Sequence, residues 1–102
     1  MSGNTQLKLI DGSNSVANFR LEGSLDFDTV PSLIENSLNQ FSSFNTIKID
    51  LSGIDYSNSA GMALLLDWQR FALLEKKKLE LLNVPTTLLN LARISEVENI
   101  IS

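Results

Sequence analysis

Three short segments of this chain alternate apolar and polar side chains, and this alternation constrains the fold more than any other feature. The segments are VANFRLE at 16–22, TIKIDL at 46–51 and LELLNV at 79–84. A period of two places one face of a strand in the core and the other in solvent, whereas strands covered on both faces are apolar throughout. We therefore expect a sheet with its helices packed mainly on one face.

A β-hairpin is expected at the start of the chain. Residues 7–10 and 16–22 flank the stretch DGSNS, in which Asp11-Gly12 is a common hairpin turn signal. The spacing predicts that these two strands pair antiparallel and that Gly23 ends the second one.

Helical segments alternate with strands along the rest of the chain. Asp28 or Thr29 can cap a helix whose first turn accepts Pro31. The pattern then predicts a strand at 46–51, a loop at 52–59, a helix at about 59–77, a strand at 79–84, a helix opened by Pro85 and a last helix capped by Ser95. This order, β-β-α-β-α-β-α-α, predicts an α/β fold with a four-stranded mixed sheet.

Length and composition exclude several classes of function. With 102 residues, the chain has room for one domain, spanning 1–102. It has no Cys and no His, and 8 basic against 12 acidic residues give a net charge of −4, which argues against a nucleic-acid surface. The lysine run at 76–78 fits the solvated end of a helix. Because neither a signal peptide nor a membrane span is visible, we expect a soluble cytoplasmic protein. Because Cys and His are absent, we expect no metal site, and we expect no cofactor.

The helix predicted at 59–77 is apolar over roughly 220° of its circumference, whereas one buried face needs about 100°. With Leu65 at the centre of the buried face, three groups share this arc: Gly61, Trp68 and Ala72 near the centre, Leu64 and Phe71 on one flank, and Met62, Leu66 and Leu73 on the other. Either neighbouring helices cover both flanks, or one flank and the first turn form a docking surface for another protein.

The start of this helix has small polar residues at Ser57, Asn58 and Ser59, followed by Gly61. Free N–H groups make a helix N-terminus tolerant of anions, so a phosphate on Ser59 would add charge without melting the helix. The alternative is simple capping, in which Ser or Asn satisfies one N–H group.

Three stretches of the sequence resemble STAS domains, the fold of anti-sigma-factor antagonists and of sulfate-transporter tails. They lie at 23–29, 49–66 and 81–101, and the resemblance runs from about residue 7 to residue 101. The central motif of that family, Asp-Ser-small-Gly, stands here as Asn58-Ser59-Ala60-Gly61. The resemblance implies that Ser59 is a phosphorylatable or partner-facing hydroxyl.

Within the family, the sequence is similar to the MlaB-type STAS subunit of the Mla phospholipid ABC transporter. The run AGMALLL followed by Trp68, the pair Asn83 and Pro85, and the closing LNLARISEVENII carry this likeness. It implies a non-catalytic subunit at the cytoplasmic side of the inner membrane that stabilises or activates an MlaF-like ATPase subunit in a pathway of outer-membrane lipid asymmetry. The implied partner-binding residues are Ser57, Asn58, Ser59, Ala60, Gly61, Met62 and Leu66.

Three alternatives stay open, and one of them is an isolated structural module with no conserved partner. Another is an anti-sigma factor antagonist, a phospho-switch that binds a serine kinase, with Ser59 as the possible phosphoacceptor. The kinase-regulated members of the family carry aspartate where this chain has Asn58. Catalysis would need a set of acid–base groups, for which the carboxylate pairs Asp26/Asp28 and Asp50/Asp55 are the candidates. Both pairs are explained equally well as turn and cap residues. The sequence has neither a P-loop nor Gly-x-Ser-x-Gly, so we expect no enzyme activity.

Overall fold

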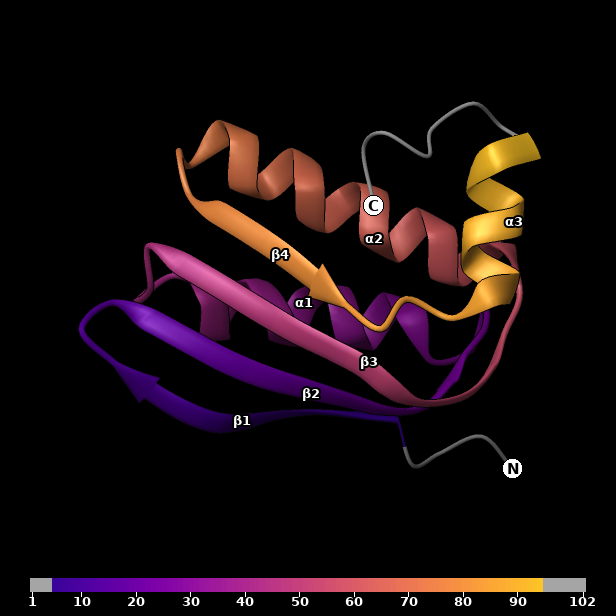
Figure 1. The fold of residues 1–102 in the computed structure, drawn as a ribbon, viewed down its shortest axis with the longest axis horizontal. Coiled ribbons are helices and arrows are strands. Elements are labelled where there is room, and N and C mark those ends of the chain that lie inside the picture. The colour runs from indigo at the N-terminus through magenta and orange to yellow at the C-terminus, as the bar shows by residue number, and fades with distance from the viewer. Residues whose placement is uncertain (1–4, 95–102) are drawn as a thin grey trace.

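The structure, a computed structural model, describes residues 5–94, with side chains described through residue 90 (Figure 1). Its elements are β1 (Gln6–Ser13), β2 (Val16–Leu25), α1 (Val30–Phe41), β3 (Thr46–Ser57), α2 (Ser59–Leu74), β4 (Lys78–Leu82) and α3 (Thr86–Ile94). The predicted order is confirmed as far as α3. The helix predicted after Ser95 lies outside the described residues.

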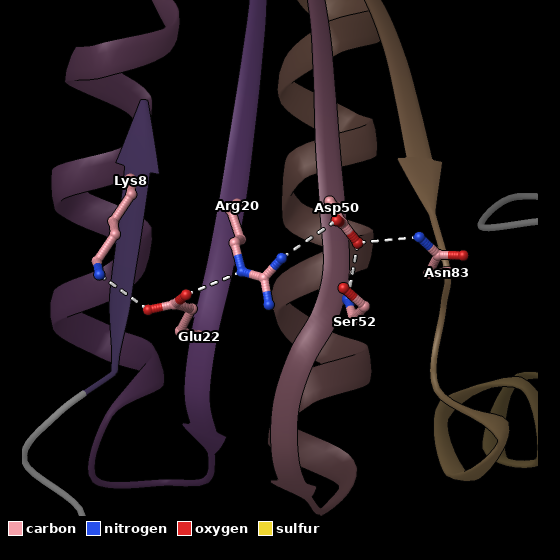
Figure 2. Close-up of polar contacts among 6 residues, drawn as sticks. All are labelled: Lys8, Arg20, Glu22, Asp50, Ser52 and Asn83. Carbon is pink, nitrogen blue, oxygen red and sulfur yellow. Dashed lines mark hydrogen bonds and ion pairs between the residues drawn. The ribbon is translucent and has the colours of Figure 1, made fainter. Parts of the chain in front are cut away.

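The four strands form one sheet in the order β1-β2-β3-β4. β1 and β2 are antiparallel, whereas β2 pairs with β3 and β3 with β4 in parallel. α1 and α2 lie behind the sheet when its polar face is viewed from the front (Figure 2). The predicted mixed sheet with helices mainly on one face is therefore confirmed, and α3 stands at the end of the sheet beside the start of α2 (Figure 1).

The hairpin turn lies three residues later than predicted. Asn14 and Ser15 have φ of 54° and 67°, whereas Asp11 and Gly12 belong to β1 and pair with β2. Two consecutive residues with positive φ suit the twist of a tight hairpin, and Asn tolerates this conformation well. The prediction was wrong because it weighed only the Asp-Gly signal and not the Asn-Ser pair that follows.

The two central strands are longer than their alternating segments. β2 continues through Gly23 to Leu25, and the predicted loop at 52–59 is in its first part the second half of β3. Shifts in register allow this extension, one of them next to Gly23, whose φ is 109°. Gly53 also permits it, because a Cβ atom there would lie 2.9 Å from the Leu21 carbonyl oxygen. Both predicted strand ends were therefore wrong.

α1 begins with a cap that neither predicted residue provides. Thr29 occupies the N-cap position but its side chain caps no helical N–H group. Instead Asp26 Oδ1 accepts hydrogen bonds from the N–H groups of Asp28 (2.9 Å) and Thr29 (3.0 Å). Thr29 Oγ1 accepts from the Asp26 N–H (3.1 Å), so the two side chains close the turn together. Pro31 lies in the first turn as predicted.

α2 ends at Leu74, three residues before the predicted end. Lys76 has a φ of 55°, and the N–H of Lys77 bonds to the carbonyl of Ala72 at 2.8 Å, which closes the last turn. The ammonium group of Lys77 donates to the carbonyl oxygens of Phe44 (2.7 Å) and Ser42 (3.2 Å). Lys76 and Lys78 are exposed as predicted, but the run follows the helix and forms the turn into β4, and Lys77 ties this turn to the segment after α1.

The core lies between the sheet and the two long helices. Trp68 of α2 is fully buried and stacks edge-to-face on Phe41 of α1, with ring centroids 5.6 Å apart. Its indole N–H donates to the hydroxyl of Ser37 at 2.7 Å, and that hydroxyl donates to the Ile34 carbonyl at 2.9 Å. Ser37 thus satisfies a buried donor, which explains a polar residue in the core that the apolar pattern could not predict.

Candidate functional site

The residues of the candidate site lie at the end of the sheet where β3 leads into α2. There Leu25, the last residue of β2, is the register partner of Ser57, the last residue of β3. The N–H of Asn58 donates to the Leu25 carbonyl at 3.1 Å, and α2 begins at the next residue. The carboxyl ends of two parallel strands and the N-terminus of a helix therefore meet, at the right-hand side of Figure 1.

Asn58 caps α2. Its Oδ1 accepts a hydrogen bond from the N–H of Ala60 at 2.8 Å, and its carbonyl accepts from the N–H of Gly61 at 3.0 Å. Capping is thus confirmed for Asn58. Ser59 is exposed, and within the described part of the chain its hydroxyl has no hydrogen-bond partner. The hydroxyl is therefore free to face a partner or to be modified.

Ala60 and Gly61 pack inward. Ala60 is 4% exposed, and Gly61 is buried against the end of β2 and α3. A Cβ atom on Gly61 would overlap the Ser57 hydroxyl and lie 3.1 Å from Leu88 and 3.2 Å from Leu25. These two residues set the position of the first turn and present no side chain at the surface.

The two apolar flanks of α2 differ in how the fold covers them. On one flank Leu64 is fully buried, and the half-buried Phe71 lies against Phe41 of α1 with ring centroids 6.3 Å apart. On the other flank Met62 and Leu66 are only half-buried, and Leu73 is 77% exposed. Helical geometry places Ser59 on this second side as well. We call Ser59, Met62 and Leu66, in the N-terminal half of α2, the open flank.

Two exposed aromatic residues, which the sequence analysis did not select, lie near the start of α2. Phe27 is 70% exposed in the turn after β2, and Tyr56 is 56% exposed near the end of β3. The stretches DFD and DYSN place each ring beside acidic or small polar residues in a turn-forming sequence. A large aromatic residue within a polar, turn-forming stretch is the sequence signal that could have predicted these exposed rings.

A ladder of polar contacts crosses the open face of the sheet (Figure 2). Glu22 accepts from Lys8 (3.0 Å) and from Arg20 (2.8 Å), and Arg20 also lies 3.7 Å from Asp50. Hydrogen bonds from Lys8 and Arg20 lower the pKa of the Glu22 carboxyl below its ordinary value. Hydrogen bonds from the Asn83 side chain (3.0 Å) and the Ser52 N–H (2.9 Å) lower the pKa of Asp50.

The carboxylates considered as catalytic pairs bond mainly to neighbouring structural groups. Asp50 belongs to the ladder, Asp26 caps the turn before α1, and Asp55 accepts a hydrogen bond from the Ser24 hydroxyl at 3.0 Å. Among residues 5–90, no group of three or more carboxylates, His or Cys is placed to hold a metal ion. No helix in the described part of the chain is long and apolar enough to span a membrane.

Comparisons with known proteins agree with this architecture. The family model described as "Mlab, STAS domain" matches residues 10–102. The fold is similar to that of the unphosphorylated anti-sigma factor antagonist SpoIIAA, with a TM-score of 0.71 and 22% identity over 96% of this chain and 85% of that one. The phosphorylated form of SpoIIAA, the Bacillus cell fate determinant, gives a TM-score of 0.67 at 22% identity over 96% and 88%.

An anti-sigma factor antagonist from Mycobacterium paratuberculosis is similar too, with a TM-score of 0.68 and 17% identity over 96% of this chain and 81% of that one. No curated protein sequence matches the chain. At identities this low, the likeness to solved structures establishes the fold alone.

Proposed function

The chain belongs to the STAS-domain family described as Mlab, and from this premise we propose that it is a non-catalytic subunit that binds the ATPase subunit of a phospholipid-transporting ABC complex. In this proposal the domain stabilises or activates the ATPase from the cytoplasmic side and sits at the inner membrane only through its partner. The pathway is that of outer-membrane lipid asymmetry.

The observation that carries the proposal is the open flank beside a firmly positioned helix start. Met62 and Leu66 are half-buried, so a partner can bury the rest of each side chain without unfolding the domain. Ser59 adds a free hydroxyl at the same edge of the helix. Apolar side chains, methionine among them, are typical of the core of a protein interface.

The remaining predicted residues support this surface from below. Asn58 fixes the first turn through its cap, Ser57 donates to the Asn58 carbonyl at 3.0 Å, and Gly61 lets the turn lie close to α3. Because these backbone positions are already ordered, little conformational entropy is lost when the surface docks.

A second candidate function is the phospho-switch of an anti-sigma factor antagonist that binds a serine kinase. The observation that favours it is the exposed Ser59 hydroxyl at a helix N-terminus, where a phosphate would meet N–H groups and the positive end of the helix dipole. Asn58 supplies the cap without a negative charge beside that hydroxyl.

The two functions are separated by one set of experiments on the purified domain. We expect it to co-purify with an Mla-type ABC ATPase from membranes and to change the rate of ATP hydrolysis by that ATPase. Incubation with an anti-sigma-type serine kinase should leave the intact mass unchanged. A stoichiometric gain of one phosphate on Ser59, with no binding to the ATPase, would replace the transporter function by the switch.

A further inference from the structure

Phe27 and Tyr56, which we call the aromatic pair, expose large rings at the same end of the molecule. In the parallel pairing of β2 and β3, Ser24 is the register partner of Tyr56 and Leu25 that of Ser57. Phe27 follows Leu25 by two residues, so both aromatic residues lie at the end of the sheet where α2 starts. Rings that are 70% and 56% exposed gain little from the fold, whereas a buried aromatic ring contributes about 150–250 Å² to an interface.

Both rings are carried by backbone that is already held in place. Phe27 lies inside the turn in which Asp26 accepts from the N–H groups of Asp28 and Thr29. Tyr56 belongs to β3, and the adjacent Asp55 accepts from the Ser24 hydroxyl of β2 at 3.0 Å. A side chain on ordered backbone loses little entropy when it is buried by a partner, which is a property of interface anchors.

The charged residues that flank the aromatic pair in the sequence are all acidic. Asp26, Asp28 and Asp55 flank the two rings, and within the described part of the chain none of them forms an ion pair. The lysine run 76–78 lies beyond the other end of α2, about 24 Å away along a helix of 16 residues. Among the side chains that the structure describes, the aromatic rings at this end therefore stand beside acidic groups.

We infer that the aromatic pair anchors the docking surface, and that the partner presents an apolar socket rimmed by arginine or lysine side chains. The inference rests on the proposed function, because it names further contact residues for the same surface and the chemistry of the ATPase region that receives them. The open flank supplies the centre of the contact, and the aromatic pair extends it across the end of the sheet. The carboxylates attract the basic rim and orient the approach.

The test is a titration of the purified ATPase subunit with the purified domain at two salt concentrations. Phe27→Ala and Tyr56→Ala should each raise Kd about tenfold or more, and the double variant should raise it further. Leu74→Ala is the matched control, because Leu74 is 75% exposed but lies at the other end of α2; it should bind like wild type. Melting temperatures should be unchanged in all variants, since these side chains are exposed.

The charge component is tested with Asp28→Asn and Asp55→Asn. Each should slow association and weaken its dependence on salt, because rim charges act mainly on the approach. Wild-type affinity in Phe27→Ala and Tyr56→Ala would overturn the aromatic anchors while the ATPase remains the partner. Salt-independent binding of the wild type would overturn the basic rim. Failure of the wild-type domain to bind the ATPase would overturn the proposed function, and this inference with it.

Discussion

The two ends of α2 both expose apolar side chains, but they differ in what surrounds them. At the C-terminal end, Leu73 and Leu74 are 77% and 75% exposed beside the lysine turn, where the chain reverses into an edge strand. At the N-terminal end, the first turn is capped by Asn58 and packed through Gly61 against β2 and α3.

Exposure alone therefore does not distinguish a binding surface from an ordinary apolar surface residue. The N-terminal end combines an unpaired hydroxyl, two exposed rings and acidic neighbours on ordered backbone, whereas the C-terminal end has two leucines next to lysines. If only the N-terminal end binds a partner, changes there should affect binding, and changes at the C-terminal end should affect neither binding nor stability.

The largest effect is expected from Leu65→Asp, which tests whether the folding of both ends of α2 depends on the core residue between them. Leu65 is fully buried, so an aspartate there would be an unpaired charge in the core and should unfold the domain, at a cost of more than about 4 kcal/mol. Circular dichroism during thermal unfolding would measure the loss. Leu73→Asp on the same helix is the control and should melt like wild type; normal melting of Leu65→Asp would contradict the observed helix orientation.

A smaller loss of stability is expected from Gly61→Ala. The added methyl group would overlap the Ser57 hydroxyl and crowd Leu88 and Leu25, which should cost about 1–3 kcal/mol. Alanine also favours a helix over glycine by about 1 kcal/mol, so the net loss should be modest but measurable by denaturant unfolding. Leu74→Ala at the C-terminal end should change stability by less than about 0.5 kcal/mol. A stabilised Gly61→Ala variant would mean that the first turn is not tightly packed.

The buried face of α2, to which both substituted residues belong, is a feature that the sequence predicts well. The apolar period identified the buried face of α2, and Gly61, Leu65, Trp68 and Ala72 are all buried as expected. Periodicity succeeds there because burial repeats regularly along a helix or strand. The order of strands and helices along the chain and the uncovered face of the sheet followed from the same signal.

Features that depend on contacts distant in sequence were not predictable in this way. The second half of β3 is a strand because β2 pairs with it, although its residues SGIDYS have the composition of a loop. The choice between the flanks of α2 was also open, because it depends on where α1 packs. The aromatic pair was missed because a single exposed ring has no periodic signal.

For the candidate site itself, Ser59→Glu should reduce partner binding by roughly tenfold or more while leaving the fold intact. The carboxylate would have to be desolvated at the contact, but in the free domain it would lie in solvent at a helix N-terminus, where a negative charge is tolerated. Titration against the ATPase subunit measures the effect. Ser13→Glu, at an exposed position in the hairpin, is the control for adding one negative charge. Unchanged affinity in Ser59→Glu would remove Ser59 from the interface.

The smallest effect is expected on the open face of the sheet, away from both ends of α2, where carboxylates have bonded partners. Glu22 and Asp50 have lowered pKa values in the folded domain, from ordinary values of 4.5 and 3.8. A carboxyl whose folded pKa is lowered adds stability above its unfolded pKa and loses that stability as the pH falls through its folded pKa. We therefore expect the melting temperature to fall slightly as the pH decreases from about 5 towards 3.

The contribution should be small because both carboxylates are solvent-accessible and their ion pairs are screened by salt. Glu22→Gln should flatten the pH dependence of the melting temperature, and 1 M salt should do the same for wild type, since at that concentration charges are screened within about 3 Å. Affinity for the ATPase should stay at the wild-type value in Glu22→Gln, because the ladder lies on the sheet face and not at the start of α2 (Figure 2). A large loss of binding in this variant would place the contact on the open face instead and would contradict the assignment of the N-terminal end of α2 as the docking surface.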